Sequence, residues 1–67
     1  MDILKNFNGY TVGVDFAKIE SELSVMSVFQ KQSDGSIKLI SCEVLGNKMT
    51  PDEKTQVMIN IDSEYGQ

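Results

Sequence analysis

The segments YTVGVDF at residues 10–16, LSVMSVF at 23–29 and IKLISCEV at 37–44 carry the strongest pattern in this chain. Each segment alternates apolar residues with polar or small ones, as a β-strand does when one of its faces is buried. In the first segment, the apolar residues Tyr10, Val12, Val14 and Phe16 share one face, so this face belongs in a core. The three segments predict an antiparallel β-meander over residues 9–46.

A short turn between the second and third segments sets the predicted register. Asp34 and Gly35 lie between two strand patterns, and an Asp-Gly pair in this position favours a two-residue type I′ turn. A hairpin centred on this turn predicts three cross-strand pairs: Phe29 with Ile40, Ser27 with Cys42, and Val25 with Val44. These pairs form one apolar face, and the sequence leaves open which face of the sheet the helix covers.

The opposite face of this hairpin is mixed in character. Polar residues on it are interrupted by four apolar ones: Met26, Val28, Ile37 and Leu39. Because apolar side chains on a second face call for cover by another element or another chain, these four residues are the predicted partner-binding surface.

A helix is predicted over residues 50–64. Thr50 is a favourable N-cap, Pro51 suits the first helical position, and Glu53 completes a capping box. Apolar residues then recur at helical spacing: Val57, Met58, Ile61 and Tyr65. An alternative interpretation takes the alternation of Val57, Ile59 and Ile61 as a fourth strand over residues 56–62.

The first residues carry little pattern. Residues 1–8 are expected to form an irregular or one-turn helical lead-in, with Ile3, Leu4 and Phe7 covering one edge of the sheet. Residues 1–67 then make a single small α+β domain, a three-stranded antiparallel meander with one C-terminal helix packed on it.

Size and composition limit the classes of function. A chain of 67 residues buries only a small core, so we expect a protein partner or a homo-oligomer. Its six basic residues are all lysine against ten acidic residues, and the absence of arginine disfavours nucleic-acid binding. No apolar run approaches the roughly 20 residues that span a bilayer, and no signal-peptide pattern is present. We therefore expect no membrane association and a cytoplasmic location.

The side chains that perform chemistry are sparse. The sequence has one cysteine and no histidine, so neither an internal disulfide nor a conventional zinc site is expected. Without a histidine to act as its base, Cys42 is expected to be a buried small apolar residue. These features predict no cofactor and no enzymatic activity.

One resemblance bears on Asp15. The strings VGVDFA at 12–17, SVMSVF at 24–29 and DGSIKLI at 34–40 resemble the opening strands of ribonuclease-H-like domains, and above all the nuclease domain of bacteriophage large terminase subunits. The resemblance implies that Asp15 matches a metal-binding aspartate, and that parallel strands with further carboxylates follow. The 67 residues have no room for those strands, and two-metal catalysis needs several carboxylates around ions roughly 4 Å apart. Asp15 is the one candidate metal ligand that this resemblance supplies.

Three functions follow from these observations. The first is a small non-enzymatic accessory protein of phage type that binds another protein in the cytoplasm of the host cell. The alternatives are a truncated ribonuclease-H-like fragment that binds a divalent metal through Asp15, and a self-assembling structural subunit.

Overall fold

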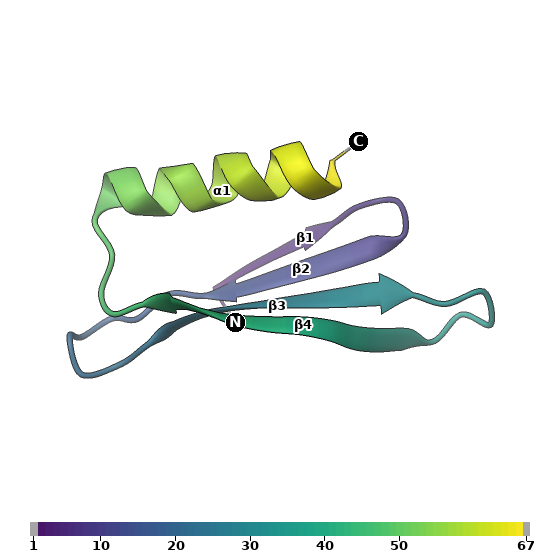
Figure 1. The fold of residues 1–67 in the computed structure, drawn as a ribbon, viewed down its shortest axis with the longest axis horizontal. Helices are drawn as coiled ribbons and strands as arrows, with labels where there is room; N and C mark the ends of the chain where they lie inside the picture. The colour runs from purple at the N-terminus through teal and green to yellow at the C-terminus, as the bar shows by residue number, and fades with distance from the viewer. Residues whose placement is uncertain (1, 67) are drawn as a thin grey trace.

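The computed structural model describes residues 2–66 as a four-stranded sheet with one helix lying across one of its faces (Figure 1). The elements follow in the order β1 (Ile3–Asn6), β2 (Tyr10–Asp15), β3 (Ser24–Lys31), β4 (Ile37–Gly46) and α1 (Pro51–Tyr65). Neighbouring strands are antiparallel, and their order in the sheet is their order in the chain. The predicted α+β class, the antiparallel sheet and the C-terminal helix are confirmed, whereas the predicted number of strands is wrong.

The additional strand is β1, where a lead-in was predicted. Its residues alternate between half-buried and exposed, and Ile3 pairs with Val14 of β2. A tight turn joins the two strands, because Phe7 and Tyr10 exchange backbone hydrogen bonds of 2.7 and 3.4 Å. Gly9 permits this turn with a φ of 94°, a left-handed conformation that glycine adopts without steric cost.

The turn between β3 and β4 differs from the predicted one. The Gly35 N–H donates to the Gln32 carbonyl at 3.1 Å, and the Gln32 N–H donates to the Ser36 carbonyl at 2.8 Å. Among the described residues only glycines have positive φ, so Asp34 does not adopt the left-handed conformation that a type I′ turn requires. The loop therefore spans three residues, 33–35, instead of two.

A β-bulge in β4 changes the register of the same hairpin. The predicted pairs of Ser27 with Cys42 and of Val25 with Val44 are confirmed. Phe29, however, pairs with Leu39, because the register shifts between Val28 and Phe29 and leaves Ile40 as the extra residue. The predicted pairing of Phe29 with Ile40 is wrong.

The helix begins as the sequence indicates. The Thr50 N–H donates to the Glu53 carboxylate at 2.9 Å, and the Glu53 N–H donates to the Thr50 hydroxyl at 3.2 Å. This capping box satisfies backbone donors that have no partner inside the helix. The alternative of a fourth strand over residues 56–62 is wrong.

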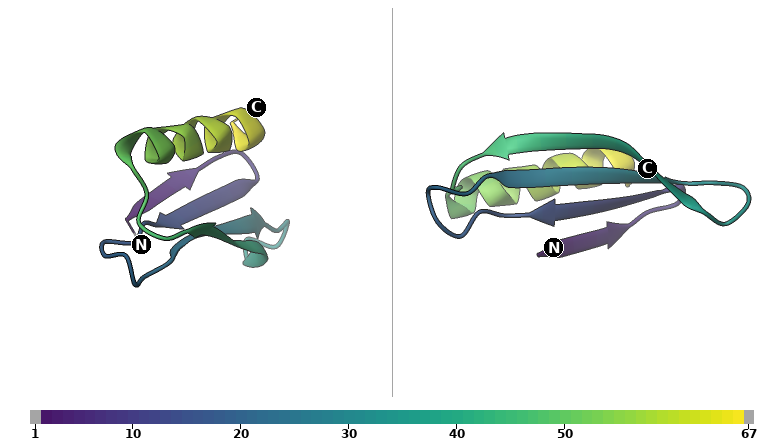
Figure 2. Two further views of the ribbon diagram at one scale, coloured as in Figure 1. Left: turned by 60° about the vertical axis from the view of Figure 1, so that its left-hand side comes forward. Right: turned by 90° about the horizontal axis from the view of Figure 1, so that it is seen from below.

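The core lies between α1 and the sheet. Its buried side chains are Val12, Val14, Phe16, Val28 and Ile61. At the carboxyl end of α1, the Tyr65 ring lies against Tyr10 and Phe7, with centroids 5.4 and 6.3 Å apart. Seen from below, the sheet has α1 behind it and no second layer of described residues in front (Figure 2, right). No helix within residues 2–66 is long and apolar enough to cross a membrane.

Candidate protein-binding surface

The face of the sheet that points away from α1 is here called the open face. Val12, Val14 and Val28 are fully buried beneath α1, so residues one position away on these strands point to the open face. By this alternation and the observed register, the open face carries Leu4, Thr11, Gly13, Val25, Ser27, Phe29, Ile37, Leu39, Cys42 and Val44.

Large apolar side chains are exposed on this face. Leu4, Ile37, Leu39 and Val44 are 59, 61, 53 and 58% exposed, and Val25 and Phe29 beside them are half-buried. Single exposed apolar residues are common on proteins, but a continuous apolar patch marks a surface that contacts another molecule.

The open face has a shallow trough between two ridges. Gly13, Ser27 and Cys42 are consecutive partners across β2, β3 and β4, and these small residues form a row called here the central trough. On one side of the trough, Phe29 pairs with Leu39. On the other side Val25 pairs with Val44. Since paired residues stand side by side on one face, each pair forms a ridge along the trough.

Among residues 2–66, the charged side chains on this face lie only at its two ends. Asp15 pairs with Val25 at one end, and Lys31 pairs with Ile37 at the other. The Lys31 ammonium donates to the Phe7 carbonyl at 3.0 Å. Since the residues between these ends are uncharged, covering the middle of the face requires no desolvation of a charge.

The four predicted partner-binding residues do not share a face. Ile37 and Leu39 lie on the open face, whereas Val28 is fully buried under α1 and Met26 packs against the core. The bulge at Ile40 explains the separation, because an extra residue reverses the alternation along β4.

The open face also contains residues from the apolar face of the predicted hairpin. Val25, Phe29 and Val44 belong to that face, and all three lie on the side of the sheet that α1 leaves uncovered. Leu4 was missed because β1 was not predicted. The alternation of Tyr10, Val12, Val14 and Phe16 correctly indicates the buried side of β2, and pairing β2 with β3 in the right register would have indicated the buried side of β3.

The two candidate reactive side chains are both exposed. Asp15 lies at the end of β2, and no group of three or more Cys, Asp or Glu side chains within residues 2–66 is placed to hold a metal ion. Cys42 was expected to be buried, but it is exposed in the central trough, where the Ser27 hydroxyl donates to its sulfur at 3.9 Å.

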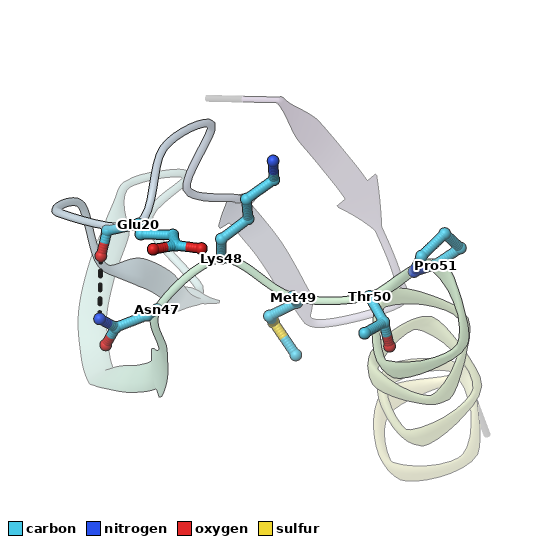
Figure 3. Close-up of a pocket in the computed structure, with 6 residues that line it drawn as sticks. All are labelled: Glu20, Asn47, Lys48, Met49, Thr50 and Pro51. Carbon is cyan, nitrogen blue, oxygen red and sulfur yellow. Dashed lines mark hydrogen bonds between the residues drawn. The ribbon is translucent and has the colours of Figure 1, made fainter.

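Two hollows lie outside the open face. The larger borders the connection between β4 and α1, where the Asn47 amide donates to the Glu20 carbonyl at 2.9 Å and the Lys48 ammonium points away from this bond (Figure 3). The smaller lies between α1 and β4, with Met26 and Leu45 beside the carboxylates of Glu43 and Glu64. In the larger hollow, the Thr50 hydroxyl accepts from the Glu53 N–H as the N-cap of α1.

Comparisons of the chain with protein-family models, with curated proteins and with solved structures found no match. The fold and the open face therefore provide the basis for a functional proposal.

Proposed function

We propose that this chain is a non-enzymatic protein-binding module that docks on another protein chain through its open face. The supporting observation is that Leu4, Ile37, Leu39 and Val44 are each more than half exposed on one face of a sheet whose other face is covered by α1. A sheet with apolar residues on both faces is stable in water when a layer covers each of them.

The free energy gained by covering the open face is large for a domain of this size. Burying the exposed part of these four side chains contributes on the order of 5 kcal/mol, which is comparable to the whole stability of a small domain. Among the described residues, eight large apolar side chains are exposed, against five in the core cluster. A partner on the open face would cover four of these eight side chains.

The polar groups of the open face favour binding over catalysis. The Thr11 hydroxyl donates to the Asn6 side chain at 2.8 Å, and the Ser27 hydroxyl points to the Cys42 sulfur. These bonds tie the groups to neighbours within the sheet. Neither contact supplies a base that would activate the hydroxyl or the thiol.

Two matched substitutions test this proposal. Leu39 on the open face and Ile59 on α1 are both 53% exposed, so Leu39→Lys and Ile59→Lys introduce the same charge at equal exposure on opposite sides of the molecule. Tagged wild-type, Leu39→Lys and Ile59→Lys proteins are each produced together with an untagged copy of the chain, and proteins retained on the tag are quantified by mass spectrometry.

The proposal predicts a stoichiometric protein, the untagged copy or another, that is retained by the wild type and by Ile59→Lys and lost from Leu39→Lys. Equal retention by all three proteins contradicts the assignment of the open face. No retention by any of them contradicts the proposed function itself.

A further inference from the structure

The open face is complementary to itself. We propose that it is covered by a second copy of this chain, packed face to face so that the two sheets form a two-fold symmetric β-sandwich. This inference rests on the proposed function and names the partner. It requires that ridges meet troughs and that opposite charges meet when the face is placed on its own copy.

The shape of the face defines the symmetry axis. The proposed two-fold axis lies in the plane between the two sheets, runs perpendicular to the strands and passes at the level of Val28. Rotation about this axis reverses the strand direction of the second copy. The central trough of each copy then lies against the ridge formed by Phe29 and Leu39 in the other. Large side chains thus fill the space above small ones, as close packing between two sheets requires.

The same operation fixes which residues meet. The axis places β3 of one copy over β3 of the other, so that Phe29 of each copy lies over Ser27 of the other. In the same way β4 lies over β4, and Leu39 of each copy lies over Cys42 of the other. Ile37 of each copy then lies over Val44 of the other, so the most exposed apolar residues of β4 cover one another. The three exposed apolar residues of β4 on this face, Ile37, Leu39 and Val44, thereby leave water.

The charges agree with this arrangement. Reversal of the strand direction brings the end of the face that carries Asp15 against the end that carries Lys31, at both edges of the interface. A two-fold axis parallel to the strands would instead bring together the two ends that carry Asp15, and likewise the two ends that carry Lys31. Opposite charges at the rim orient an interface and disfavour alternatives.

The area fits a reversible dimer. Four strands about 4.8 Å apart and four to ten residues long present roughly 450 Å² per copy, or about 900 Å² in total, which is the size of small, transient interfaces.

Pairing through the free edge of β4 fits the structure less well. The bulge at Ile40 interrupts the regular geometry of this edge, and Lys38 adds a charge to it. Bulges and edge lysines are devices that prevent strands from adding to a sheet. The opposite edge, β1, has only four residues. The face therefore offers the better contact.

The first test is the mass in solution. Sedimentation equilibrium of the wild type should give a dimer at micromolar concentration that dissociates on dilution. Leu39→Lys should be a monomer over the same range, and Ile59→Lys should behave as the wild type. Amide spectra of each variant verify that the fold is retained, because both replaced side chains are exposed in the single chain.

The second test exchanges the charges at the ends of the face. Asp15→Lys and Lys31→Asp each place like charges together in the proposed dimer, so each should self-associate roughly tenfold more weakly than the wild type. An equimolar mixture of the two variants should form a heterodimer with close to wild-type affinity, because opposite charges then meet at both ends. An edge-paired dimer would show no such recovery, since β2 and β3 lie inside the sheet.

A wild type that stays monomeric at every concentration, or a dimer that persists in Leu39→Lys, overturns the inference. A mixture of the charge variants that associates no more tightly than either alone overturns the proposed orientation. Retention of a different protein through Leu39, with no self-association, would leave the proposed function standing while this inference fails.

Discussion

Ser24 and Asn47 are joined by a partly buried hydrogen bond, in which the Ser24 hydroxyl donates to the Asn47 carbonyl at 3.2 Å. The same hydroxyl accepts from the Ala17 N–H at 2.8 Å, and the Ser24 side chain is fully buried. One side chain thus ties the end of β2 to the connection that carries the chain from β4 to α1. This junction positions the helix over one face of the sheet and leaves the other face open.

Replacement of Ser24 by alanine should therefore destabilise the fold by about 1–3 kcal/mol, because it leaves the buried Ala17 N–H without its acceptor and the partly buried Asn47 carbonyl without its donor. The free energy of unfolding in urea measures this loss. Ser27→Ala, on the open face, is the matched control and should change it by less than about 0.5 kcal/mol. Equal effects of the two substitutions would contradict the role assigned to Ser24.

The N-cap of α1 should also be measurable in the stability of the domain. Thr50→Ala removes the hydroxyl that accepts from the Glu53 N–H, and it should cost about 1 kcal/mol in urea denaturation. Thr55→Ala is the control, because the Thr55 hydroxyl donates only to the Pro51 carbonyl within the helix. If Thr50→Ala is no more destabilising than Thr55→Ala, the capping box does not contribute as described.

The same cap predicts a pH dependence. The pKa of Glu53 lies below its ordinary value of 4.5, because the backbone N–H of Thr50 donates to the carboxylate and the Thr50 side chain adds to the effect. A lowered folded-state pKa gives a contribution to stability that is present above the unfolded-state pKa and is lost as the pH falls through the folded-state value. Glu53→Gln should lack this acid-dependent part of the unfolding free energy, and an unchanged pH profile would refute the prediction.

Elements determined by neighbouring residues could be predicted from the sequence, whereas the short N-terminal strand could not. The cap at Thr50 and the alternation of Val12 and Val14 are determined by neighbouring residues, and both were predicted correctly. β1 was missed because four residues in a strand carry too short a pattern to distinguish from a loop.

The surface was harder to predict than the elements. Which side of β3 is buried depends on its register with β2, since Val28 is covered only because it lies beside Val12. The extra residue at Ile40 belongs to the pairing of two strands and has no signature within one of them. For this reason Met26 and Val28 were assigned to the wrong face, whereas Ile37 and Leu39 were placed on the exposed one.

Cover of the open face should make the effect of an exposed residue depend on protein concentration. Val28→Ala should cost about 2 kcal/mol at any concentration, because Val28 is in the core of the single chain. Val44→Ala should be nearly neutral in dilute solution, where Val44 is 58% exposed, and destabilising at concentrations where the face is covered. Urea denaturation at low and high protein concentration measures both. A Val44→Ala effect that does not change with concentration would count against cover by a second copy.

The central claim, that a protein chain covers the open face, is tested most directly by the reactivity of Cys42. This thiol is the only one in the sequence and lies exposed in the central trough, so its alkylation by N-ethylmaleimide reports on that face alone. The rate constant of alkylation should fall as the wild-type protein is concentrated and the complex forms, whereas that of Leu39→Lys should stay the same at every concentration. A wild-type rate that is independent of concentration, and equal to that of Leu39→Lys where sedimentation shows a complex, would contradict the account.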